Sequence, residues 1–378
     1  MAVEHPPFTI GIEEEYLLVD RETRDLVSDP DPKMWDGLRE VLGPQVGPEF
    51  LRAQIEVGTR TSRTLQEAHA DLARLRRDLA SVVEGYGAAI IASSTHPFAQ
   101  WWDQTHTDEA RYARLAADFQ QVARRLVICG MHVHVGIDDP DLRIDLMNQV
   151  RYFLPHILAL STSSPFWTGR ETGLQCYRLS VFQTLPRTGI PEEFSSWSEY
   201  ERHVKVLIDA GIIEDPTKLW WDIRPSHRYP TLEMRVADVC TRLVDGIAVA
   251  GLYLALLEML FRLRTENMRW RTYAPMLISE NLWRAQRYGV EGSLMDYGRG
   301  ELVEFRDLVE ELLALTEVDA RRLGITEEVS HIRNIAKEGT SARRQLDVYH
   351  RALEGGASNR EALEEVVDHL IVDTMTGL

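Results

Sequence analysis

Apolar and polar side chains alternate along several short segments of this chain, the pattern of strands with one polar face. In "FTIGIEEEYLLVD", Phe8 to Asp20, residues 8–19 predict a strand. Side chains two residues apart share a face, so Glu13 and Glu15 project together while Glu14 projects to the other side. Apolar flanks favour a buried strand over a solvated run of charge. The segment therefore predicts a pair of carboxylates on one face of a sheet.

Three further segments repeat this design. Each has an ordinary interpretation by itself, as exposed histidines, a cross-strand ion pair or a half-solvated strand. Considered together, their polar faces are expected to line one cavity, where several carboxylates coexist only if cations neutralise them. The polar positions are His132 and His134 in "GMHVHVGI", Glu233 and Arg235 in "TLEMRVAD", and Arg52, Gln54 and Glu56 in "EFLRAQIEVG", with Glu49 just before that strand.

Helical spacing and capping signals predict the other elements. Thr64 followed by Glu67 is a capping-box signature, and the apolar stripe that starts at Leu65 predicts a helix over 64–86. These elements, without a repeat or a long linker, predict an α+β fold in one domain over 1–378. Its strand-rich part is about 8–240 and its helical part about 241–378. The expected strands are 51–59, 88–94, 126–137, 219–225 and 231–239, and the expected helices are 108–125, 241–264, 276–288, 300–322, 326–336, 340–353 and 359–373.

Composition narrows the class of protein. The formal charge of −17, from 42 Lys and Arg against 59 Asp and Glu, argues against nucleic acid as a partner. Three cysteines without CxxC spacing favour a reducing, cytoplasmic compartment. The first residues lack the pattern of a secretory signal, and the apolar stretch Ile247 to Leu257 is too short to span a bilayer. We therefore expect a soluble protein without a membrane partner.

The predicted carboxylate cavity suits a phosphorylated ligand. Oxygen ligands in this number suit Mg²⁺, and histidine among them adds tolerance for Mn²⁺. A cage that holds two or more such ions suits a polyphosphate, and Arg235 in the same wall would meet a transferring phosphoryl group. The chain has neither GxxxxGK[ST] nor GxGxxG, so ATP would be bound by another kind of fold.

The order of these motifs resembles a known family. "GIEEEYLLVD", "GMHVHVG" and "LEMRVAD" resemble three strand motifs of the glutamine synthetase fold. With "QIEVGT", "STHPFAQW", "FQTLPRTGIP", "ENLWRAQRYG" and "GTSARRQLDVY", the chain resembles the YbdK-type carboxylate-amine ligases, a glutamate-cysteine ligase type 2 family, over roughly 8–350. The resemblance implies a glutamine synthetase-like catalytic fold, in which an antiparallel sheet forms a funnel covered by helices.

The resemblance also implies two sites for divalent ions beside ATP. The expected ligands are Glu15 and Glu56 with Glu49 for one ion, and Glu13, His132 and Glu233 for the ion that grips the ATP phosphates. His134 would lie beside the nucleotide, and Arg235 would contact the γ-phosphate. The implied nucleotide-binding set is thus His134, Arg235 and Glu233, and the implied catalytic pair is Arg235 and Glu56.

Three residues are candidates for binding substrate. Arg178 and Arg52 are candidates for the substrate carboxylate, because a guanidinium group pairs with a carboxylate bidentately, although structural arginines are an equal alternative. His96, in "STHPF", is a candidate for the acceptor side, and its alternative is ordinary turn chemistry before proline.

The expected function is that of an ATP-dependent carboxylate-amine ligase. ATP phosphorylates a carboxylate, an amine attacks the acyl phosphate, and an amide is formed, with glutamate and cysteine as the pair that the family name suggests. Two alternatives stay open: a binuclear metallohydrolase that activates water, and a non-catalytic ATP-binding protein of the same fold. A symmetric homodimer is expected, because twofold homo-oligomers are the commonest kind.

Overall fold

An antiparallel sheet forms the centre of the molecule. The computed structural model describes residues 5–378, apart from the side chain of Arg111. Seven strands pair in the order β10-β11-β5-β1-β3-β2, and β4 pairs with the far end of β1. The expected antiparallel sheet is therefore present. Its strands are β1 (Ile10–Asp20), β2 (Val46–Pro48), β3 (Gln54–Gly58), β4 (Ala88–Ile91), β5 (Met131–Gly136), β10 (Ile223–Pro225) and β11 (Thr231–Met234).

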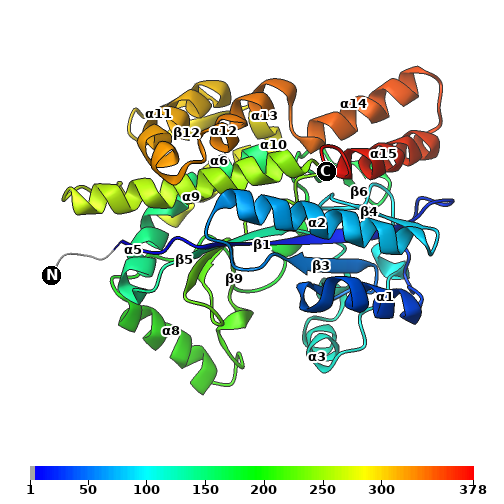
Figure 1. Cartoon of the computed structure of the whole chain (residues 1–378), viewed down its shortest axis with the longest axis horizontal. Coiled ribbons are helices and arrows are strands. Elements are labelled where there is room, and N and C mark those ends of the chain that lie inside the picture. The colour runs from blue at the N-terminus through cyan, green and yellow to red at the C-terminus, as the bar shows by residue number, and fades with distance from the viewer. Residues whose placement is uncertain (1–4) are drawn as a thin grey trace.

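Helices cover one side of this sheet. In Figure 1, α2 (Leu65–Glu84) and α9 (Leu243–Thr265) run across it, and most C-terminal helices stack beyond α9. On the opposite side, α3 (Ala110–Phe119) and α8 (Trp197–Asp209) stand well apart from each other. The other helices are α1 (Pro32–Leu42), α4 (Gln121–Arg124), α5 (Pro140–Val150), α6 (Leu154–Ser161), α7 (Arg178–Phe182), α10 (Pro275–Tyr288), α11 (Phe305–Leu323), α12 (Thr326–Ser330), α13 (Ile332–Glu338), α14 (Ser341–Glu354) and α15 (Asn359–Thr374).

Short strand pairs lie outside the central sheet. Two of them are antiparallel and one, β8 with β9, is parallel. The β12–β13 pair occupies the start of the helix expected at 300–322, so that helix begins only at Phe305. These strands are β6 (Phe166–Trp167), β7 (Arg170–Glu171), β8 (Thr188–Gly189), β9 (Trp220–Trp221), β12 (Ser293–Asp296) and β13 (Glu301–Glu304).

Other expected helices differ in their details. The start of α2 is as expected, because the Thr64 hydroxyl accepts a hydrogen bond from Glu67 N at 3.2 Å. The reciprocal half of the capping box is shifted, since the Glu67 carboxylate accepts from Arg63 N. The helix expected at 108–125 is divided into α3 and α4 at Gln120, whose φ of +47° breaks the helical path. The helix expected at 326–336 is likewise two short helices, and α1 was not expected.

The core helix α9 corrects one expectation from the sequence. It is 23 residues long, and among the described residues it is the helix long and apolar enough to cross a membrane. However, 94% of its most apolar window is buried inside the protein. Its apolar character is explained by packing, because it lies between the sheet side of the core and the C-terminal helices.

The covered face of β1 contains a buried ion pair. Glu14 and Arg76 of α2 are both fully buried, and their charged atoms lie 2.7 and 2.9 Å apart. The Tyr16 hydroxyl also donates to Glu14. Arg76 donates further to the carbonyl oxygens of Cys240 and Thr241, at 2.9 and 2.7 Å. The middle glutamate of the triplet therefore ties the sheet to α2, on the face opposite to Glu13 and Glu15.

We predict that Glu14→Gln destabilises the protein by about 3–5 kcal/mol, because it leaves the Arg76 guanidinium as an uncompensated buried charge. Urea unfolding measures this change. Asp36→Asn is the matched control, since Asp36 pairs with Arg39 at 3.9 Å on the surface and its loss should cost less than about 0.5 kcal/mol. Equal unfolding midpoints for the two variants would contradict the prediction.

Candidate functional site

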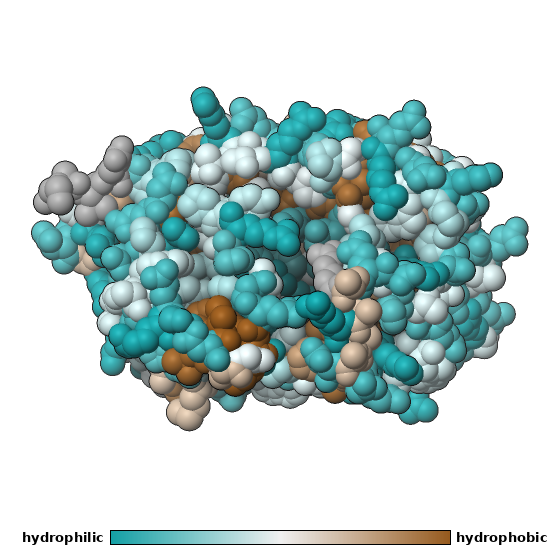
Figure 2. Space-filling model, turned by 90° about the horizontal axis from the view of Figure 1, so that it is seen from below, coloured by the Kyte–Doolittle hydropathy of each residue, from teal (hydrophilic) through white to brown (hydrophobic). Residues whose placement is uncertain are grey.

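A cavity of about 490 Å³ opens on the uncovered face of the sheet. Figure 2, a view from below, shows this side of the molecule hollowed near its middle among hydrophilic side chains. Most of the residues singled out from the sequence meet there, which is the shared cavity that the four polar strand faces predicted. Those that line it are Glu13, Glu15, Glu49, Gln54, Glu56, His132, His134, Arg178, Glu233 and Arg235.

Strand register brings these side chains together. Neighbouring strands place polar residues directly opposite one another across β3, β1, β5 and β11, so that the polar positions form a continuous row over four strands. The opposed pairs are Glu15 with Glu56, Glu13 with His132, and His134 with Glu233. The polar positions predicted from alternation within each segment thus lie on the same face of the sheet.

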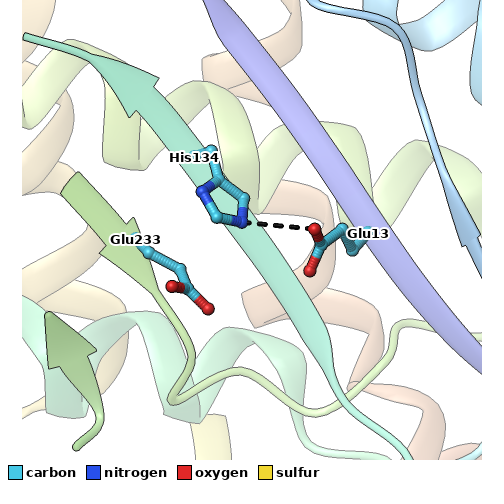
Figure 3. Close-up of side chains that lie close together, drawn as sticks. All are labelled: Glu13, His134 and Glu233. Atoms are coloured by element: carbon cyan, nitrogen blue, oxygen red, sulfur yellow. Dashed lines mark ion pairs between the residues drawn. The ribbon is translucent and has the colours of Figure 1, made fainter. Parts of the chain in front are cut away.

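Three overlapping groups of side chains have the geometry of metal ligands. In each group one potential ligand atom per residue lies within 4.8 Å of the others. Figure 3 shows one of them: Glu13, His134 and Glu233 converge from three strands, with His134 Nε2 3.4 Å from the Glu13 carboxylate. The grouping differs from the expected one. Glu13 and Glu233 were expected to share a metal ion with His132, but the histidine grouped with both of them is His134. The groups are Glu13, His134 and Glu233; Glu13, Glu56 and His132; and Glu15, Glu49 and Glu56.

The all-carboxylate group is electrostatically crowded. Burial and the charge of Glu49 raise the pKa of Glu15 to about 7. Burial and the neighbouring glutamates, Glu49 foremost, raise the pKa of Glu56 well above its usual range. Carboxylates packed in this way stay ionised only beside compensating positive charge. This is the condition that a divalent cation with oxygen ligands satisfies.

The histidine side of the cavity has the opposite balance. Burial and nearby Arg235 lower the pKa of His132 to about 4, so its ring is neutral at pH 7, and its Nε2 has no hydrogen-bond partner among the described residues. A neutral imidazole with an available nitrogen is the form that binds metals. Glu13 is only partly buried; burial acts to raise its pKa, but hydrogen bonds with His132 and His134 hold that pKa below the usual range. Glu13 therefore remains a carboxylate.

Two arginines hold Glu233. Arg224 of β10 donates from Nε at 2.9 Å, and Arg235 donates from Nη1 to the other oxygen. Their charges outweigh burial and lower the pKa of Glu233. Arg224 also lines the cavity and was missed from the sequence. Arg224 could have been predicted only from its position opposite Glu233 in a hairpin, and that position is known only when the register of the two strands is known.

Arg178, at the first turn of α7, reaches the cavity with a buried and ordered guanidinium group. It donates to the carbonyl oxygens of Arg235 and Val236 at 3.2 and 3.3 Å. The group lies against Gly130, where an added Cβ would come within 2.4 Å of Nη2. Glycine at this position is therefore required for the observed placement of Arg178.

The structure does not bring Arg52 or His96 to the cavity. Arg52 pairs with Asp29 and its side chain is 39% exposed, because β3 begins only at Gln54 and the alternation does not extend back into the preceding turn. The buried His96 ring accepts hydrogen bonds from the amides of Phe98 and Ala99, and its other nitrogen bonds a loop carbonyl. The alternative interpretations therefore hold: Arg52 is a structural arginine, and His96 supports a turn.

Comparison with known proteins assigns the chain to a family. Residues 9–369 match the family described as glutamate-cysteine ligase family 2. A protein of Rhodospirillum rubrum, provisionally named glutamate–cysteine ligase 2, is 60% identical over all of this chain and 98% of its own length. A protein of Jannaschia with the same name is 51% identical over 97% of this chain and 96% of its own.

Solved structures show the same fold. Glutamate–cysteine ligase from Francisella tularensis, solved in complex with AMP, has a TM-score of 0.70 at 14% identity, over 100% of this chain and 90% of that one. A bifunctional glutathione synthetase from Pasteurella multocida has a TM-score of 0.66 at 15% identity, over 97% of this chain and 52% of that one. The expected fold is confirmed, and so are the family and its enzyme class, a ligase that forms carbon–nitrogen bonds. The chain belongs to glutamate-cysteine ligase family 2.

Proposed function

We propose that this protein is an ATP-dependent ligase that joins a carboxylate to an amine through an acyl phosphate, with glutamate and cysteine as the first pair to consider. The observation that carries the proposal is the set of three ligand groups on one sheet face beside two arginines of the cavity wall, Arg178 and Arg235. The names of the relatives support the class of substrates, and the AMP complex of the Francisella structure supports an adenine nucleotide.

The cavity residues fit Mg²⁺, with Mn²⁺ as an alternative. One group has only oxygen ligands, and each of the others combines two carboxylates with one imidazole. Glu56 belongs to two groups, which supports its catalytic assignment. Bound there, divalent ions would neutralise the phosphate oxygens and the charge that shifts during phosphoryl transfer.

The arginines act on the reacting groups. Arg178 holds the substrate carboxylate with its planar fork, and Arg235 stabilises the γ-phosphoryl group. The carboxylate oxygen attacks the γ-phosphorus, the bond to the β-phosphate oxygen breaks, and ADP leaves. The amine then attacks the acyl carbon and phosphate leaves. His134 lies beside the nucleotide, and its ring is oriented by the Thr231 hydroxyl, 3.0 Å from Nδ1.

The two alternative functions lack a supporting observation. A metallohydrolase that activates water has no need of two arginines beside its ions, and a non-catalytic ATP-binding protein has no need of a complete ligand set. The remaining expectations stand as proposals: a single catalytic domain, a symmetric homodimer, and a cytoplasmic location in which the three buried cysteines stay free thiols. The carboxylate-lined cavity also supports small molecules, not nucleic acid, as partners.

We predict ADP release from Mg²⁺ and ATP only when a carboxylate and an amine are both present. The measurement is coupled ADP detection over a panel of amino acids offered singly and in pairs, beginning with glutamate and cysteine. A chelator in excess of the metal should stop the reaction. Steady ADP release without either substrate would support the hydrolase instead, and ATP binding without release under any pairing would support the non-catalytic alternative.

We predict that Glu13→Gln weakens binding of Mg²⁺-ATP by at least about tenfold, because Glu13 belongs to two ligand groups. Isothermal calorimetry measures the affinity. Glu14→Gln is the matched control at a temperature where both variants are folded, since its side chain is on the opposite face of β1, and it should retain the wild-type affinity. Comparable losses in the two variants would contradict the assignment of faces.

We predict that Arg178→Lys raises KM for the carboxylate by at least about tenfold, because lysine keeps the charge but lacks the bidentate fork. The KM for ATP should stay within about twofold of wild type. Arg52→Lys is the control, since Arg52 pairs with Asp29 outside the cavity, and it should leave both constants unchanged. A carboxylate KM that is unaffected in Arg178→Lys would remove Arg178 from the substrate site.

A further inference from the structure

Asp222 lies behind the cavity wall, where the charges of two arginines that line the cavity, Arg178 and Arg235, act on it. Its backbone is held on both sides: its carbonyl oxygen accepts from Arg235 N at 2.8 Å, and its amide donates to Gly189 O at 2.9 Å. Arg235, whose amide bonds the Asp222 carbonyl, lines the cavity, and so does Arg224, two residues after Asp222. Asp222 directly precedes β10, and these contacts fix it next to the cavity wall.

The Asp222 carboxylate is buried without a hydrogen-bond partner at one oxygen. The residue is 2% exposed, and its Oδ2 has no partner among the described residues. The charged groups that act on it are Arg178 from α7 and Arg235 after β11, yet it forms no ion pair with either among the described contacts. A buried carboxylate oxygen is costly to leave unsatisfied, so one in a native site indicates a group that it receives during function.

A second buried aspartate provides the contrast. Asp238 also faces Arg178, but both of its oxygens are occupied. Oδ2 accepts from Ser163 N at 2.9 Å and from the Ser164 hydroxyl at 2.7 Å, while Oδ1 lies 3.2 Å from the Cys176 thiol. Ser164 in turn accepts from Arg178 N, so Asp238 supports the start of α7. Its contacts explain its burial, whereas those of Asp222 do not.

The proposed ligase reaction requires a base. At neutral pH an aliphatic amine is an ammonium ion, without the electron pair that attacks an acyl phosphate. We propose that Asp222 is the general base for the acceptor amine, a step that rests on the proposed function. The ammonium ion binds within reach of Asp222, whose carboxylate is opposite to it in charge, and one of its N–H bonds breaks as the proton passes to Asp222 Oδ2. The freed electron pair on nitrogen forms the bond to the acyl carbon, and the C–O bond to phosphate breaks with its own electron pair staying on phosphate. The second proton of the nitrogen passes to the departing phosphate, which leaves a neutral amide.

The titration of Asp222 agrees with this role. Burial raises the pKa of Asp222 to about 7, although the charges of Arg178 and Arg235 oppose the rise. A base with such a pKa exchanges protons readily near neutral pH. Because Asp222 accepts a proton only when ionised, amide formation should rise as the pH increases through about 7.

Hydroxylamine tests the assignment, because it is largely uncharged at neutral pH and attacks an acyl phosphate without a base. We expect Asp222→Asn to lower amide formation from glutamate, cysteine and Mg²⁺-ATP by at least about 100-fold. Hydroxamate formation from glutamate, hydroxylamine and Mg²⁺-ATP should stay within about threefold of wild type. The rise of amide formation near neutral pH should be lost in the variant.

The control is Asp238→Asn, which should change both reactions by the same factor because Asp238 acts through Arg178. Wild-type amide formation in Asp222→Asn, or an equal loss with both nucleophiles in a variant that still binds Mg²⁺-ATP, overturns the assignment. Asp222→Ser decides the question by the same comparison if the asparagine variant does not fold. A wild-type protein that forms neither product from any carboxylate of the panel overturns the ligase proposal itself, and the role of Asp222 with it.

Discussion

Mutual repulsion among partly buried carboxylates is the constraint on which the rest of this structure depends. Glutamates from neighbouring strands face each other on the open side of the sheet, and burial makes their charge harder to stabilise. Such a cluster requires compensating positive charge, which the arginines supply on one side of the cavity and the proposed divalent ions would supply on the other. The same sheet presents apolar residues to α2 and α9, so it separates a charged reaction chamber from a hydrophobic core.

Most residues that line the cavity on these strands could be predicted from the alternation of side chains along each strand. Glu13, Glu15, His132 and Glu233 are found in the cavity because period-two patterns within a strand survive whatever the neighbouring strands do. Arg52 shows the limit, since the pattern includes it but the strand does not. Where a strand begins depends on its partner, and no pattern within one segment contains that information.

Residues whose role depends on a neighbouring strand were not predicted from the sequence. Arg224 matters because it stands opposite Glu233 in a hairpin, and Asp222 because its carbonyl oxygen accepts from Arg235 N just before that hairpin begins. The helices show a similar limit. A single residue, Gln120, turns one expected helix into two by its positive φ, and glutamine does not mark such a conformation in advance.

The buried Arg76 also bears on how the chain folds. Besides Glu14 and the Tyr16 hydroxyl, its acceptors are the carbonyl oxygens of Cys240, Thr241 and Thr374, which lie 164, 165 and 298 residues further along the chain. A guanidinium group cannot leave water until those carbonyls are in position, so α2 cannot dock fully on β1 before α15 arrives. Folding is thereby coupled to contacts of very high sequence separation, which is the condition for slow and strongly cooperative closure of the core.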